Sequence, residues 1–267
     1  MFSSVLVAFD LGTAADRALP VAGALAGLGG LPIELLTVVS PGTTGVLPET
    51  LDERVRPFGF GRHRSLVVED DDPGTAIAEH LRSRDGVLLV MATTAGAALD
   101  QSHGGSVSEH VLSASGQPVL LVGPNVAVDR PRSTPSLVVA VDASDLAAAA
   151  LPVIVSWVRT FGAGSVTAVQ VIPLVPAIAE QAGPALEAAH VRQYVATLGE
   201  FGVAAEGAVV HSGDPAAGLI EAAGRVAAPV LVVTAEPWPD AGTHWRGTSR
   251  KLALRSTGPV LVVPATG

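Results

Sequence analysis

The sequence repeats itself, and this repeat constrains the fold more than any other feature of the chain. Five apolar or turn-forming segments occur twice, in the same order. The pairs are 5–10 and 137–142, 35–39 and 168–172, 71–77 and 213–220, 87–90 and 230–233, and 117–122 and 258–263. Such a repeat indicates two copies of one structural unit. We therefore predict two domains, residues 1–124 and 136–267, joined by a proline-rich linker at 125–135.

Each copy alternates apolar runs typical of strands with stretches typical of helices. In the first copy we expect strands near 4–9, 33–39, 64–68, 87–92 and 118–122, and helices near 13–28, 73–83 and 106–115. Strands separated by helices form parallel sheets through right-handed crossovers. Hydrophobic residues make up 48% of the chain but aromatic ones only 4%, so aliphatic side chains must fill the core. Aliphatic strands of this kind suit a sheet that is covered on both faces, and the predicted fold class is α/β with two doubly wound parallel sheets of five strands.

Composition excludes several classes of function. The formal net charge of −9 argues against nucleic acid or an anionic membrane as the main partner. The absence of cysteine excludes disulfides, zinc–thiolate sites and thiol catalysis. The first residues lead directly into a strand-like segment rather than a signal peptide, and no apolar run approaches the roughly 20 residues of a membrane span. We therefore expect a cytoplasmic protein.

Four features of each copy together resemble the universal stress protein family in its tandem, two-domain form. The first strand ends in Asp, an Asp-Pro pair opens the middle helix, Gly-Ser or Gly-Thr opens the last helix, and a Pro-Val-Leu strand closes the copy. The residues are Asp10 and Asp142, 72–73 and 214–215, 105–106 and 247–248, and 118–120 and 259–261. This resemblance implies an adenine-nucleotide alpha hydrolase-like fold with strand order 3-2-1-4-5. It also implies that the edge strands near 118–122 and 259–263 pair with each other, as the two subunits of the family's homodimer do. Homo-oligomers of the whole chain are a further alternative.

The resemblance also implies a nucleotide site in the first copy. Family members that bind ATP carry Gly-x-x-Gly, nine further residues, and then Gly followed by Ser or Thr. By this resemblance Asp10 contacts the ribose and Val38 frames the adenine, and the other site residues are Met91, Ala92, Ala95, Gly105, Ser106 and Val107. Alanine stands at 92 and 95 where the pattern has glycine. Alanine is penalised if the loop needs a positive φ angle, so we expect weak ATP binding here.

The second copy departs further from the pattern. Asp142, Val171, Gly247 and Thr248 occupy the corresponding positions, but Thr234 and Pro237 replace the two glycines. Proline fixes φ and lacks the N–H that a phosphate would use. We therefore expect ATP to bind to the first domain rather than the second.

Each site residue also has a purely structural interpretation. Asp10 and Asp142 can cap the helices that follow them, and the Gly-Ser and Gly-Thr pairs are favoured helix N-caps. The acidic run 69–72 can hold Mg²⁺ beside a nucleotide, because carboxylate oxygens suit that ion, or it can be a solvated loop that contains one N-cap.

The resulting prediction is a cytoplasmic stress-response regulator with weak or single-domain ATP binding. The alternative is an interaction scaffold that has lost nucleotide binding, which the substitutions at the glycine positions favour. A slow ATPase ranks last, because no catalytic triad, paired carboxylates or P-loop lysine stands out. We therefore do not expect an enzyme.

Overall fold

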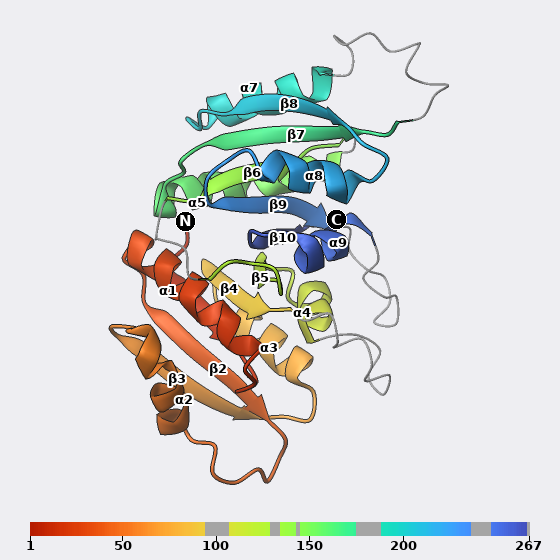
Figure 1. Cartoon of the computed structure of the whole chain (residues 1–267). Coiled ribbons are helices and arrows are strands. Elements are labelled where there is room, and N and C mark those ends of the chain that lie inside the picture. The colour runs from red at the N-terminus through yellow and green to blue at the C-terminus, as the bar shows by residue number, and fades with distance from the viewer. Residues whose placement is uncertain (94–106, 129–133, 143–144, 175–187, 236–246, 266–267) are drawn as a thin grey trace.

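The computed structural model describes residues 1–93, 107–128, 134–142, 145–174, 188–235 and 247–265. Strands and helices alternate along both halves of the chain (Figure 1). The strands are β1 Ser4–Ala8, β2 Ile33–Val39, β3 His63–Glu69, β4 Val87–Ala92, β5 Val119–Val122, β6 Ser136–Ala140, β7 Val166–Ile172, β8 Glu206–His211, β9 Pro229–Ala235 and β10 Val260–Pro264. The α-helices are α1 Ala18–Gly29, α2 Pro48–Val55, α3 Pro73–Arg82, α4 Val107–Ser115, α5 Leu151–Phe161, α7 Ala189–Glu200, α8 Pro215–Ala223 and α9 Thr248–Arg255.

The described strands form one ten-stranded sheet in the order β3-β2-β1-β4-β5-β10-β9-β6-β7-β8. The first half therefore has the order 3-2-1-4-5, and the second half repeats this order in the opposite direction across the sheet. Neighbouring strands within each half are parallel. These observations confirm the predicted α/β fold and strand order.

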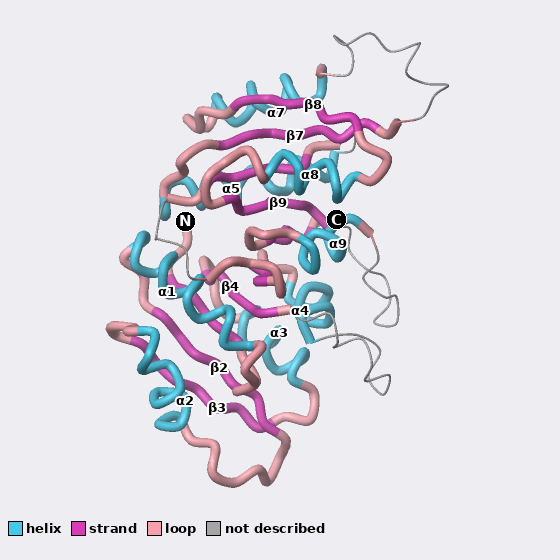
Figure 2. The backbone as a smooth tube through the Cα atoms, viewed as in Figure 1, coloured by secondary structure: helices cyan, strands magenta, loops and turns pink. Residues whose placement is uncertain are grey.

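Alternation along the strands divides the core into two layers. Val5 and Val7 of β1 face one layer, which is completed by α1, α2, α5 and α7. Leu6 and Ala8 face the other layer, which is completed by α3, α4, α8 and α9. Figure 2 shows helices on both sides of the strands. Burial on both faces explains why the inner strands β1, β4, β5 and β10 are aliphatic runs rather than alternating apolar and polar residues.

The two halves join in the middle of the sheet, where β5 and β10 pair in antiparallel fashion (Figure 1). Leu120 lies opposite Leu261, and all four residues of β5 are buried. An apolar strand left at the edge of a sheet is a template for aggregation. The pairing covers this edge in both halves at once.

An aromatic cluster adds a second contact between the halves. Phe2, at the start of the chain, stacks on Phe161 of α5 with ring centroids 5.7 Å apart. It also meets Trp157 edge-on at 6.4 Å. Three aromatic side chains therefore meet where α5 packs against the first half.

The sequence analysis did not predict one helix of the first half. The segment between β2 and β3 contains α2, followed by the short 3-10 helix η2 Arg56–Phe58. Leu51 and Val55 of α2 are fully buried, one helical turn apart. Proline at the first position of α2 and this spacing were the available signals.

Among the described residues, no helix is both long and apolar enough to cross a lipid bilayer.

A buried carboxylate in β2 ties α3 to the sheet. The side chain of Glu34 is 8% exposed, and its Oε1 lies 2.6 Å from Nε2 of His80 on α3. Arg84 forms an ion pair with the same oxygen, and Arg64 of β3 lies 3.9 Å from Oε2. Burial on its own raises the pKa of Glu34, but the hydrogen bonds and charges of His80 and Arg84 bring it below its ordinary value.

This cluster predicts that the stability of the protein depends on pH in the acidic range. Because the pKa of Glu34 is lowered in the folded state, its contribution to stability is complete above the ordinary glutamate pKa, about 4.3, and is lost as the pH falls through the folded value. We expect the melting temperature of Glu34→Gln to fall less on acidification than that of the parent protein. The exposed change Glu53→Gln should follow the parent. Parallel curves for the parent and Glu34→Gln would contradict this role.

Candidate functional site

A cavity of about 350 Å³ opens at the carboxyl ends of the strands in the first half. It lies where β1 is flanked by β2 on one side and β4 on the other, so the crossovers from β1 and β4 lead in opposite directions. Open α/β sheets bind ligands at such switch points. The lining residues are Ala8, Phe9, Asp10, Ala14, Ala15, Leu36, Val38, Pro73, Ile77, Met91, Ala92, Thr93, Val107 and Ser108.

The loop after β1 is held in a defined conformation. The Oδ1 atom of Asp10 accepts a hydrogen bond from the N–H of Gly12 at 2.9 Å. Between them Leu11 has a φ angle of +62°, in the left-handed region that non-glycine residues rarely adopt. The Thr37 hydroxyl donates to the carbonyl of Phe9 at 2.8 Å and joins this loop to β2. The exposed Asp10 carboxylate is thereby fixed at the mouth of the cavity.

The cavity combines an apolar body with two features that suit a polar ligand. Among the described residues that line it, Asp10 has the only charged side chain. The first residues of α4, Val107 and Ser108, form part of the wall. The first turn of a helix carries unpaired N–H groups and the positive end of the helix dipole, which favour anions. The site can therefore hold an apolar ring, a hydroxyl group on the carboxylate, and a negative charge at the helix.

The structure brings together five of the residues expected in the first copy. Asp10, Val38, Met91, Ala92 and Val107 all line this cavity. The other three, Ala95, Gly105 and Ser106, lie outside the described residues.

Several lining residues were missed by the sequence analysis. Thr93 directly follows β4, and Ile77 lies one turn into α3. The N–H of Thr93 donates to the carbonyl of Val122 at 3.0 Å, so this group already has a partner. The position of Thr93 at a strand end was a usable signal. No local pattern marks Ile77, because it also fits an ordinary core position.

The corresponding residues of the second copy lie at the same edge of the second half. Asp142 follows β6 and is exposed, Val171 lies in β7, and Thr248 is the first residue of α9. Gly247 precedes this helix with a φ angle of +121°, where other residues would be strained. Thr234 is part of β9, and Pro237 lies outside the described residues.

Basic side chains of α9 are engaged by a neighbouring carboxylate. Asp214 caps α8 by accepting a hydrogen bond from the N–H of Ala216. Its carboxylate also contacts Lys251 at 3.2 Å and Arg255 at 3.3 Å. The hydrogen bond from Lys251 lowers the pKa of Asp214. In the first half the equivalent cap, Asp72, faces His110 at 3.3 Å.

The acidic run 69–72 is largely occupied by local hydrogen bonds. Asp72 accepts bonds from the N–H groups of Gly74 and Thr75 and so caps α3. Asp70 accepts from the N–H of Asp72 at 2.8 Å. Within the described part of the chain, no group of three or more His, Asp or Glu side chains is arranged to hold a metal ion. Asp72 therefore is the N-cap that the sequence analysis allowed in this run.

Comparison with known proteins agrees with this architecture. Residues 1–123 match the model of the universal stress protein family. The crystal structure of a universal stress protein from Archaeoglobus fulgidus DSM 4304 superposes with a TM-score of 0.69 at 18% identity, covering 99% of this chain and 97% of that one. A protein of unknown function from Pseudomonas aeruginosa PAO1 gives a TM-score of 0.66 at 19% identity, covering 99% and 93%. No curated protein matches the chain significantly.

The family match and the structural likeness support each other. The matched residues 1–123 contain all five strands of the first half and its cavity. At identities below one fifth, the structural likeness establishes the fold of the whole chain, including the second half. The match to the universal stress protein family model thus covers residues 1–123, and the solved structures show that the chain shares their fold.

Proposed function

We propose that this protein is a cytoplasmic stress-response regulator that binds an adenine nucleotide, ATP, weakly and in its first domain only. The observation that carries the proposal is the cavity at the switch point, lined by five of the expected residues. In this proposal the nucleotide shifts the population of a partner-binding state, and the protein is not an enzyme.

The lining chemistry supports an adenine nucleotide in particular. Val38 and Met91 provide an apolar surface for the base, while the carboxylate of Asp10 can accept hydrogen bonds from ribose hydroxyls. The phosphates would lie toward the start of α4, where backbone N–H groups favour anions. Ala92 adds a methyl group where the family pattern has glycine, which supports weak rather than tight binding.

The second domain is proposed not to bind nucleotide. Lys251 is the only lysine of the chain, and both it and Arg255 contact Asp214. A phosphate at α9 would have to compete with this carboxylate for the same cations. The alternative function, a scaffold that binds no nucleotide in either domain, is favoured by the alanine at 92.

The duplication provides a matched pair of variants. Asp10→Asn keeps the oxygen that accepts from the N–H of Gly12 but removes the negative charge. We expect it to weaken Mg-ATP binding about tenfold, roughly 1.4 kcal/mol, because a charged acceptor is lost from the ribose contact. Asp142→Asn makes the same change in the second domain and should leave the affinity unchanged. Isothermal titration calorimetry of all three proteins measures both effects, with a stoichiometry of one per chain.

Other results of these titrations would contradict parts of the proposal. No heat from the parent protein at millimolar nucleotide would reject nucleotide binding and leave the scaffold. Equal losses in the two variants would contradict binding to one domain. Repeating the titration with EDTA in place of Mg²⁺ shows whether the metal contributes. Release of ADP above the background rate would establish the ATPase and overturn the proposed non-enzymatic role.

A further inference from the structure

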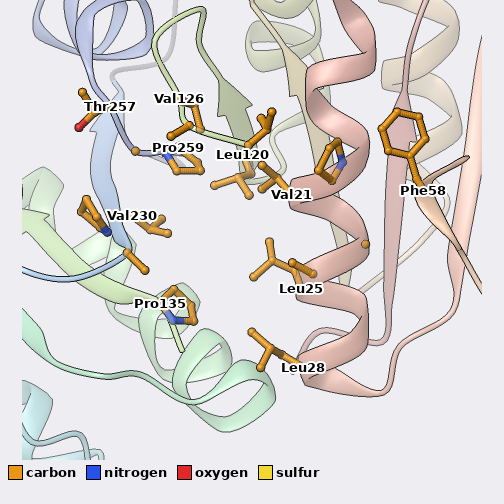
Figure 3. A pocket seen from close by; sticks show the side chains of 18 of the residues that line it. Val21, Leu25, Leu28, Phe58, Leu120, Val126, Pro135, Val230, Thr257 and Pro259 are labelled. Carbon is orange, nitrogen blue, oxygen red and sulfur yellow. The ribbon is translucent and has the colours of Figure 1, made fainter. Parts of the chain in front are cut away.

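A second cavity, of about 300 Å³, lies between the two halves of the chain (Figure 3). One wall is α1, from which Val21, Leu25 and Leu28 point toward the opposite wall. The opposite wall belongs to the second half and includes Val230 and Pro259. It is separate from the cavity at the switch point, since the two have no described lining residue in common.

Among the described residues that line this cavity, none has a charged side chain and only Thr257 has a polar one. Four of the lining residues are prolines, which lack a backbone N–H. They are Pro20, Pro135, Pro229 and Pro259. The described walls of the cavity therefore have few groups that could form hydrogen bonds with a ligand.

Backbone carbonyls of the walls already have donors. The carbonyl of Ala228 accepts from the N–H of Ser136, and that of Pro259 accepts from the N–H of Leu231, each at 3.0 Å. The carbonyl of Val126 accepts from Arg17 Nη2 at 2.6 Å. Each of these three carbonyls thus already accepts one hydrogen bond. A polar ligand must replace its lost hydration, whereas an apolar ligand needs no hydrogen-bond partner.

The internal repeat allows α1 to be compared with its counterpart α5. The segment 18–21, Ala-Leu-Pro-Val, recurs as 150–153, in register with Asp10 and Asp142. In this alignment α5 carries Trp157 where α1 has Leu25, and Phe161 where α1 has Gly29. Trp157 and Phe161 are buried among other side chains. Both α1 residues are smaller than their counterparts. Leu25 lines the second cavity, whereas Gly29 packs against Phe161, which would lie 3.0 Å from a β-carbon there.

A further contact on α1 depends on a small residue. A β-carbon at Gly23 would lie 2.5 Å from Cε1 of Phe60. Phe60 can therefore lie directly against the helix, and it forms part of the cavity lining together with Phe58. The two rings have centroids 6.2 Å apart. They supply an aromatic wall.

We propose that this cavity between the halves binds a small, uncharged, mainly hydrocarbon molecule. Apolar cavities at domain boundaries are common ligand sites. An apolar cavity of about 150 Å³ in another protein holds benzene, so this one accommodates a ligand of about two rings. The walls come from both halves, so the ligand contacts both domains. This inference does not depend on nucleotide binding.

The probe for this site is N-phenyl-1-naphthylamine, an uncharged aromatic amine whose fluorescence rises in apolar surroundings. The full chain should bind it with a saturable rise in emission. Val21→Trp places a large ring in the cavity, and Leu28→Glu places a charge at its rim, where Leu28 is 39% exposed. We expect each change to weaken probe binding about tenfold or more, because space or an apolar surface is lost.

Leu174→Glu is the matched control, because Leu174 is 65% exposed and does not line the cavity. It should bind the probe like the parent. The proposal is overturned if the parent shows no saturable binding, or if Leu28→Glu and Val21→Trp both bind like the parent. It is also overturned if the parent is a dimer that Leu28→Glu separates into monomers, since this face would then contact a second copy of the chain.

Discussion

Trp157→Ala is expected to lower the free energy of unfolding by about 3–5 kcal/mol, the range for a large aromatic residue removed from a core. Trp157 is fully buried in α5. Its ring lies edge-on to Phe161 at 4.9 Å and to Phe2 at 6.4 Å. The substitution therefore removes apolar burial and two aromatic contacts at once. Because Phe2 belongs to the first half, the loss also weakens the contact between the two halves.

Chemical denaturation followed by circular dichroism measures this loss. Trp157→Phe is the graded comparison, since it keeps an aromatic ring. It also removes an indole N–H that is buried without a hydrogen-bond partner in the described structure. We expect it to cost clearly less than the alanine change. Phe201→Ala, at a residue 50% exposed, should change stability by less than about 0.5 kcal/mol. If Trp157→Ala were no more destabilising than Phe201→Ala, the cluster would have no role in stability.

The fold could be predicted from the sequence because its signals are repeated and local. The aliphatic runs near 4–9, 87–92 and 118–122 correspond to strands that are buried on both faces, and each run recurs in the second half. Asp72 and Asp214 mark helix starts by a specific physical mechanism, and both act as N-caps in the structure. The helix α2 was missed because its two buried residues, Leu51 and Val55, lie in an otherwise polar segment.

The two candidate sites differ in the same way, because only one of them is marked by local signals in the sequence. Asp10, Val38 and Ala92 could be placed from the resemblance, since each follows or ends a predicted strand. The cavity between the halves could not be predicted. Its walls, such as Leu28 and Pro259, come from segments distant in the sequence that meet only after β5 and β10 have paired.

The junction between the halves also depends on a close approach that permits only glycine. Gly123 directly follows β5 and is buried, and a β-carbon there would lie 1.9 Å from the carbonyl oxygen of Ala253 in α9. The surrounding segment is held in place. Arg17 donates to the carbonyl of Val126 at 2.6 Å, and Asn125 donates to the carbonyl of Leu254 at 3.0 Å. The backbone therefore cannot move aside without breaking these bonds.

Gly123→Ala is accordingly expected to lower the free energy of unfolding by about 1–3 kcal/mol or more, the usual cost of forcing an extra methyl group into a packed site. Gly27→Ala is the matched control. Gly27 is exposed in α1, and a β-carbon there meets nothing within 4 Å. Alanine at an open helix position should stabilise the protein by roughly 0.5–1 kcal/mol. Denaturation midpoints of the two variants should thus move in opposite directions from the parent. A midpoint for Gly123→Ala at or above that of the parent would show that α9 can withdraw from β5 at little cost, and the two halves would then be only loosely joined.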